Sequence, residues 1–237
     1  MCSSDKHLQA NLTSLSERIS LAARRAGRPA GSVAVVAVSK TFPAEAVLAL
    51  ANCGQRHFAE NYLQEALPKI DAVRAAAPGL PLTWHFIGPI QSNKTRAIAE
   101  HFAWVHSVDR LKIAERLAAA RPAGLPPLNV LLQVNADAED TKSGVAPDEL
   151  AALAQAVARL PRLALRGLMC IPRPAADFEA QRRPFARLRG LRDALAAGGL
   201  ALDTLSMGMS ADLEAAVAEG STLVRVGTAI FGERSAH

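Results

Sequence analysis

The sequence is short of cysteine, of aromatic residues and of long apolar runs, and each shortage excludes a class of protein. Its three cysteines, Cys2, Cys53 and Cys170, are too few and too scattered for a disulfide framework or a thiolate metal site. No apolar run is long enough to cross a bilayer, and the first residues lack the apolar core of a secretion signal. The sequence therefore predicts a protein of the reducing cytoplasm that contacts no membrane and holds no metal.

The scarcity of aromatic residues, 4% of the 237 residues, also bears on the basic charge of the chain. Lys+Arg number 27 against 22 Asp+Glu, a formal net charge of +5. Proteins that bind nucleic acid gather such charge on one face and interleave aromatic side chains. Here the arginines are scattered over predicted helices, and we interpret the densest group, Arg182, Arg183, Arg187 and Arg189, as a solvated helix face. We expect no nucleic-acid partner.

What the sequence does contain is an alternation of short β-branched runs with longer runs rich in Ala, Leu and charged residues. Residues 33–38 are all apolar, which is typical of a strand covered on both faces. Eight strands are predicted, at 33–38, 56–59, 82–87, 102–105, 128–134, 163–168, 201–205 and 222–226. Helices are predicted at 7–26, 43–52, 62–76, 92–101, 110–120, 147–159, 178–197 and 211–219.

Eight strand–helix units in a chain of this length predict an α/β fold of the (β/α)8 TIM barrel type. An open, doubly wound parallel sheet is the alternative, and periodicity alone does not distinguish the two. No linker, low-complexity tract or repeat divides the chain. We therefore expect residues 1–237 to form a single barrel domain with a leading helix at about 7–26.

Polar residues follow the predicted strands, where the loops of such a barrel carry its chemistry. Lys40, one of only six lysines, comes directly after six apolar residues and Ser39. Partial burial at the barrel mouth would lower the pKa of its amine and free it for Schiff-base chemistry. The alternative is an ordinary lysine that reaches from the strand end to water.

The loops after the last two strands suggest a phosphate site. Residues 206–210 form a glycine-containing loop that opens a helix, with Ser210 as its expected cap and Gly220 at its end. Gly227 and Thr228 follow the eighth strand. Backbone N–H groups at such turns bind phosphate, and phosphate sites recur at this end of barrels. The alternative is that the glycines only permit tight turns.

A lysine, a phosphate cradle and Arg225 together suggest pyridoxal 5′-phosphate (PLP) as the cofactor. The lysine would hold the cofactor, the cradle would hold its phosphate, and Arg225 would face the pyridine nitrogen. Because an arginine accepts no proton, the ring nitrogen would stay unprotonated and the cofactor would be a weaker electron sink. The alternative for Arg225 is a surface ion pair at a strand end.

Seven motifs, in order from about residue 8 to 234, match one known family. They are Ala37-Val-Ser-Lys-Thr41, Phe58-Ala-Glu-Asn-Tyr62, Trp84–Lys94, 134–135 with 142–144, 166–172, 205–210 and 220–232. On these motifs the chain resembles the YggS/PROSC family of pyridoxal phosphate homeostasis proteins. Ala59 is a departure, because the family usually has glycine there.

The resemblance implies a fold-type III PLP-binding barrel like the alanine racemase N-terminal domain, with PLP held as an internal aldimine on Lys40. It also implies phosphate contacts from Ser210, Gly227 and Thr228, and Arg225 near the ring nitrogen. The remaining residues implied to line the pocket are Asn61, His85, Ser206 and Met207. The family motif includes Lys142, whose role stays open.

The implied function is non-catalytic: the protein would store, buffer or deliver PLP and so maintain intracellular B6 vitamer and amino-acid homeostasis. Its partners would be PLP and apo PLP-dependent enzymes, and the protein would be a monomer. The alternative is a PLP-dependent amino-acid racemase or lyase on the same barrel. Racemases of this fold add a C-terminal β-domain, whereas this chain ends at His237, and they need protonating groups on both faces of the cofactor. Tyr62, the only tyrosine, is the one candidate to stand opposite Lys40.

Overall fold

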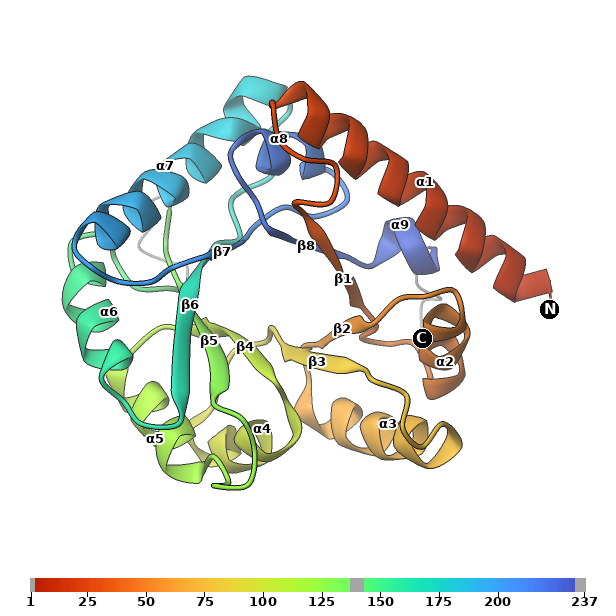
Figure 1. Ribbon diagram of the computed structural model, residues 1–237, viewed down its shortest axis with the longest axis horizontal. Helices are drawn as coiled ribbons and strands as arrows, with labels where there is room; N and C mark the ends of the chain where they lie inside the picture. The colour runs from red at the N-terminus through yellow and green to blue at the C-terminus, as the bar shows by residue number, and fades with distance from the viewer. Residues whose placement is uncertain (1–2, 137–142, 233–237) are drawn as a thin grey trace.

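Eight parallel strands close into a barrel in the computed structural model, which describes residues 3–136 and 143–232 (Figure 1). Each strand pairs with the next along the chain, and β1 pairs with β8 to complete the ring. The strands are β1 (Ala34–Val38), β2 (His57–Glu60), β3 (Thr83–Phe86), β4 (Trp104–Val108), β5 (Leu128–Gln133), β6 (Leu163–Met169), β7 (Thr204–Ser206) and β8 (Leu223–Val226). The barrel prediction is confirmed, and the open-sheet alternative is wrong.

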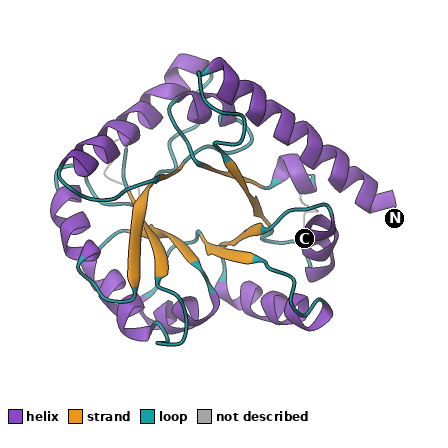
Figure 2. Ribbon diagram, viewed as in Figure 1, coloured by secondary structure: helices purple, strands orange, loops and turns teal. Residues whose placement is uncertain are grey.

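Helices surround the strands on the outside of the ring (Figure 2). They are α1 (Ser3–Arg25), α2 (Ala44–Asn52), α3 (Leu63–Ala76), α4 (Thr95–His101) with the 3-10 turn η1 (Ser92–Lys94), α5 (Leu111–Ala120), α6 (Leu150–Ala158), α7 (Phe178–Ala197), α8 (Leu213–Ala218) and α9 (Thr228–Phe231). Every predicted helix is present. In the described residues no helix is long and apolar enough to cross a membrane.

The leading helix α1 belongs to no strand–helix unit and lies against the last part of the chain (Figure 1). The Asn11 amide donates to the carbonyl of Ile230 over 2.9 Å. Arg28, just past the helix, donates to the carbonyls of Val217 and Ser221 over 2.7 Å each. The helix thus holds the two ends of the described barrel together.

The fourth strand differs from its prediction, which placed it at 102–105. β4 begins at Trp104 and runs to Val108, with an irregular register against β5. His106 and Ser107, which we expected just past the strand, are buried inside it. A polar pair looks like a strand exit in the sequence, but here both side chains find hydrogen-bond partners within the barrel.

The apolar core lies mainly between the strands and the helices, where one large cluster of buried side chains surrounds the ring. A much smaller apolar cluster, Val36, Val38, Ala59 and Leu223, is separate from it. Polar side chains, among them His85, His106, Ser206 and Arg225, are buried in the strands as well. One of these buried polar residues, Arg225, also lines a pocket at the end of the barrel.

Candidate functional site

A pocket of about 280 Å³ lies at the carboxyl ends of the strands. Residues from the exits of β1, β2, β7 and β8 meet there. Six of the nine predicted cofactor residues line it: Lys40, Asn61, Ser210, Arg225, Gly227 and Thr228. Val38, Ile87, Ile171, Met209 and Ala211 complete the lining and supply apolar walls. The barrel therefore gathers residues that lie between Val38 and Thr228 in the sequence into one small-ligand site.

The other three predicted residues do not line this pocket. His85, Ser206 and Met207 are fully buried in the protein. Met207 packs in the large apolar core. Ser206 accepts a hydrogen bond from Arg225 and so lies behind the pocket wall, with His85 further along the same hydrogen-bonded chain.

This chain of hydrogen bonds crosses the inside of the barrel and ends on Arg225. His57 Nδ1 lies 3.0 Å from His85 Nε2, and His85 Nδ1 lies 2.9 Å from His106 Nε2. His106 Nδ1 lies 2.8 Å from the Ser206 hydroxyl oxygen, to which Arg225 Nη1 donates over 2.7 Å. The step from His106 to Ser206 joins β4 and β7, which are not neighbours in the sheet. The chain thus connects opposite walls of the barrel.

Hydrogen-bonding capacity favours one direction for this chain. A guanidinium only donates, so the Ser206 oxygen accepts from Arg225, and the hydroxyl hydrogen is used within the chain when it goes to His106 Nδ1. His106 then donates from Nε2 to His85 Nδ1, and His85 donates from Nε2 to His57 Nδ1. Acceptance at Nδ1 needs neutral rings, and burial holds the pKa of both His85 and His106 well below the ordinary value. The positive charge of Arg225 lowers the pKa of His106 further.

Arg225 is held from several directions at the pocket wall. Its Nη1 also donates to the Ser206 carbonyl over 2.7 Å, and its Nη2 donates to the Cys170 carbonyl over 3.0 Å. The residue is only 4% exposed, and burial lowers the pKa of its guanidinium. A surface ion pair, the alternative considered for Arg225, is therefore wrong.

A buried ionic cluster fixes the chain on both sides of Lys40. Lys69 Nζ, from α3, lies 2.7 Å from Glu60 Oε1 and 2.9 Å from Glu65 Oε1. Lys69 also donates to the Ser39 carbonyl over 2.8 Å, and the Ser39 hydroxyl donates to Glu60 Oε1 over 2.7 Å. The N–H of Thr41 donates to Glu65 Oε1. Lys40 thus stands between two residues whose backbones are tied to one cluster.

This cluster was missed in the sequence, although a signal exists. Lys69 falls on the helix face that also carries Leu63, Ala66, Ile70 and Val73, all buried. A lysine on the apolar stripe of a helix indicates a buried partner, because a buried ammonium must be paired. Burial raises the pKa of Glu60, while the hydrogen bonds from Lys69 and Ser39 act in the opposite direction.

Asn61 lines the pocket and carries a buried acceptor. Its side-chain oxygen is buried, and no partner for it exists among the described residues. The Asn61 carbonyl is approached by Gly88 so closely that a Cβ at position 88 would lie 2.0 Å from it. Only glycine fits there, and its close approach holds the Asn61 backbone in place. An orphaned oxygen so positioned suits a ligand hydroxyl or N–H group.

Ser210, Gly227 and Thr228 add donors to the pocket lining. Gly227 immediately precedes α9, whose first N–H groups have no intrahelical acceptors. Ser210 is not the cap that we predicted: α8 begins at Leu213 after Asp212, whose carboxylate instead accepts from the N–H of Met209 over 2.6 Å. This bond shapes the loop that carries Ser210.

The remaining sequence predictions at the site have mixed outcomes. Lys142 lies outside the described residues. Tyr62 is 55% exposed and does not line the pocket. Within residues 3–136 and 143–232, no group of three or more histidine, cysteine or acidic side chains is arranged to hold a metal ion.

Comparison with known proteins decides the family. The family model of the alanine racemase N-terminal domain matches residues 10–235. A pyridoxal phosphate homeostasis protein of Pseudomonas aeruginosa is 62% identical over 224 residues, which cover 94% of each chain. This chain belongs to the pyridoxal phosphate homeostasis protein family.

Solved structures agree with this membership of the family. PipY of Synechococcus elongatus, solved with PLP bound, is 41% identical, with a TM-score of 0.78 over 92% of this chain and 99% of that chain. An alanine racemase of Clostridium difficile has a TM-score of 0.75 at 14% identity and shares the fold. This chain covers 58% of that racemase chain.

Proposed function

We propose that this protein binds PLP in the pocket at the strand exits, attached through Lys40, and that it serves PLP homeostasis rather than catalysis. The observation that carries the proposal is the composition of the pocket wall. One face offers an amine, and another offers hydroxyl and backbone donors on glycine-containing turns. A relative 41% identical to this chain has been solved with PLP bound, which supports the same ligand here.

The donor set fits such a cofactor group by group. Ser210, Gly227 and Thr228 would bind the phosphate, for which hydroxyl and backbone N–H donors are suited. Asn61 would offer its orphaned oxygen to a polar group on the ring. Arg225 would donate toward the ring nitrogen and keep a proton from it. When bound, the cofactor supplies a reactive aldehyde and an electron-withdrawing ring.

A carrier role follows from what faces the ligand. Among the described residues that line the pocket, Lys40 and Arg225 are the only ones with side chains that titrate or carry charge. A racemase or lyase that moves protons on both faces of its substrate needs a second acid or base. The hydrogen bonds of Arg225 to Ser206 and to the Cys170 carbonyl hold its guanidinium in one position as a donor. Such a group is suited to binding a cofactor rather than to transferring protons in catalysis.

Trapping the cofactor tests the site. The protein incubated with PLP and reduced with borohydride should carry the cofactor on the peptide that contains Lys40, and Lys40→Ala should abolish this label. Lys112→Ala, on an exposed face of α5, is the matched control and should label normally. Labelling that survives in Lys40→Ala at the same stoichiometry would reject the attachment site.

A transfer assay and an exchange assay test the role. We propose that the protein acts in the cytoplasm as a monomer and delivers PLP to apo PLP-dependent enzymes. The PLP-loaded protein should reactivate an apo-enzyme faster than an equal amount of free PLP does. Exchange of the α-hydrogen of alanine or serine at enzymatic rates would favour the racemase or lyase alternative, and analytical ultracentrifugation reports the oligomeric state.

A further inference from the structure

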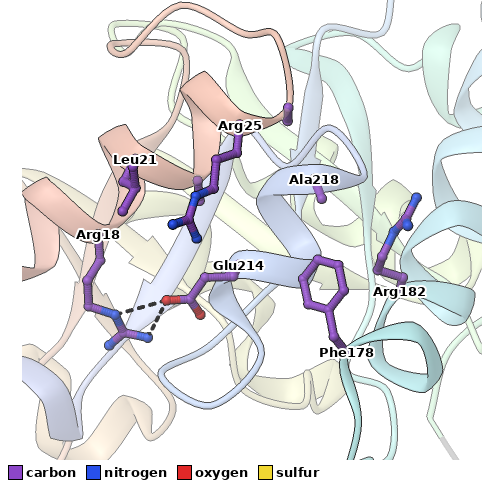
Figure 3. A pocket seen from close by; sticks show the side chains of 9 residues that line it. Arg18, Leu21, Arg25, Phe178, Arg182, Glu214 and Ala218 are labelled. Carbon is purple, nitrogen blue, oxygen red and sulfur yellow. Dashed lines mark hydrogen bonds and ion pairs between the residues drawn. The ribbon is translucent and has the colours of Figure 1, made fainter.

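A second and larger cavity, of about 700 Å³, lies on the outside of the barrel (Figure 3). Helices α1, α7 and α8 form its walls, and it shares no lining residue with the pocket of Lys40. The residues that line it are Arg18, Leu21, Ala22, Arg25, Ala26, Phe178, Arg182, Glu214 and Ala218. Its volume falls in the range of about 300–1,000 Å³ that is typical of small-molecule sites.

One part of this outer cavity is apolar and open. Leu21 is 43% exposed and Phe178 is 46% exposed, and both are among the few large apolar side chains that the described protein leaves in water. Three alanines, Ala22, Ala26 and Ala218, lie beside them. The side chain of Phe178 stands at the cavity edge, with the guanidinium of Arg182 5.7 Å from its ring centre. These groups offer a flat apolar ligand a surface to cover.

The other part carries three guanidinium groups, two of which are already paired. Arg18 donates to one oxygen of Glu214 through Nε at 3.0 Å and Nη2 at 2.8 Å. Arg182 bonds Glu219, a carboxylate only 1% exposed. The arginine-rich stretch of α7 is therefore only in part the solvated helix face that we predicted, because Arg182 binds a buried carboxylate.

Arg25 is the exception. No hydrogen bond or ion pair of Arg25 occurs in the described part of the chain, and its side chain extends into the cavity toward Glu214 (Figure 3). One guanidinium in this cavity is therefore left without an anion. A guanidinium fork is well suited to a carboxylate or phosphate in two-point contact.

We propose that this outer cavity binds a small molecule that combines an aromatic body with one anionic group. The anionic group would bind Arg25, with Arg18 close by, and the aromatic body would cover Phe178 and Leu21. Charge complementarity argues for this occupant, because the one unmatched charge in the cavity is positive and lies beside its apolar wall. The proposal stands independently of whether the inner pocket takes PLP.

Phenyl phosphate and inorganic phosphate are suitable probes, measured by calorimetry on the untreated protein and again on protein reduced with PLP, which separates binding in the outer cavity from binding in the inner pocket. We expect phenyl phosphate to bind with a stoichiometry of one, and inorganic phosphate to bind about tenfold more weakly. Arg25→Gln should weaken phenyl phosphate binding about tenfold. Arg24→Gln, the exposed neighbour that does not line the cavity, is the matched control and should change nothing.

Phe178→Ala separates the two halves of the site. This variant should lower the affinity for phenyl phosphate to that for inorganic phosphate. The affinity for inorganic phosphate should not change. The proposal fails if phenyl phosphate shows no saturable binding, if Arg24→Gln and Arg25→Gln have equal effects, or if the two probes bind alike. A dimer that Arg25→Gln dissociates would also overturn it, because the occupant would then be a second copy of the chain. Circular dichroism of each variant confirms that it is folded.

Discussion

His106 Nδ1 lies 2.8 Å from the hydroxyl oxygen of Ser206, a residue 100 positions later in the chain. This single contact joins the three histidines of β2, β3 and β4 to Arg225 on β8. The orientation of the three imidazole rings is therefore coupled to that of the Ser206 hydroxyl, which binds the Arg225 guanidinium.

The histidine tautomers are the first prediction. Because Arg225 can only donate to Ser206, we expect His85 and His106 to be neutral and protonated on Nε2 at pH 7. Nitrogen-15 NMR of labelled protein distinguishes the two ring nitrogens directly. A hydrogen on Nδ1 of His106 would contradict the proposed direction of the chain.

The second prediction concerns how the free energy of unfolding depends on pH. The pKa of His85 and that of His106 are depressed by burial, so below about pH 6.5 the unfolded chain binds protons that the folded protein does not. The stability is therefore fully present above that pH and decreases as the pH falls. We expect a loss of about 1.4 kcal/mol per pH unit for each histidine.

Urea denaturation between pH 7.5 and 5.5 measures this slope. Replacement of both histidines by asparagine should flatten the profile, even though it lowers the overall stability. His7→Asn, which replaces an exposed histidine, is the control variant. A free energy of unfolding in the wild type that does not decrease below pH 6.5 would show that these rings are not buried as described.

The cluster at Lys69 gives the third prediction. Lys69→Met leaves the carboxylate of Glu60 buried without its cation, and we expect a loss of about 3–5 kcal/mol of stability. The same variant frees the Ser39 carbonyl and the Glu65 carboxylate that bonds Thr41. Borohydride labelling of Lys40 should therefore decrease in the molecules that still fold.

A compensating variant tests the cause of this loss. Adding Glu60→Gln to Lys69→Met removes the unpaired charge and should recover part of the stability. Lys112→Met, on an exposed helix face, is the control and should stay within about 0.5 kcal/mol of the wild type. Equal stability of Lys69→Met and Lys112→Met in chemical denaturation would rule out a buried pair.

Gly88 gives the fourth prediction. A methyl group at this position would overlap the Asn61 carbonyl, and we expect Gly88→Ala to destabilise the protein by about 1–3 kcal/mol. Gly190→Ala is the matched control, because Gly190 lies within α7 and a Cβ there would meet nothing within 4 Å. That control should stabilise the protein by about 0.5–1 kcal/mol. If both variants melt at the same temperature, the close approach at Asn61 is not a real constraint.

The fold was predictable because strand and helix periods alternate clearly along the chain. Six of the predicted cofactor residues meet in one pocket, since residues just past parallel strands share one end of a barrel. His106 shows the limit of this reasoning. A polar residue in a short apolar run looks like the end of a strand, and the pairing of Val108 with Leu132 on β5 shows that this strand continues.

The Lys69 cluster and the outer cavity could not be predicted from the sequence, because their residues come from distant parts of the chain. Lys69 is visible as a misplaced charge on an apolar helix face, but its partners Ser39 and Glu60 come from two different strand exits. The cavity at Arg25 is assembled from α1, α7 and α8, which are far apart in the sequence. No local pattern marks which arginine lacks a carboxylate. Such features depend on the closed ring, and they follow only once its geometry is known.

The contacts of α1 have a consequence for synthesis on the ribosome. Asn11 bonds the carbonyl of Ile230, 219 positions later, and Arg18 Nη2 reaches the carbonyl of Ser210, 192 positions later. The helix must wait on the ribosome for partners that are translated about 200 residues after it. The pocket at the strand exits has the same dependence, because the nascent chain cannot complete its lining before Thr228 has been translated.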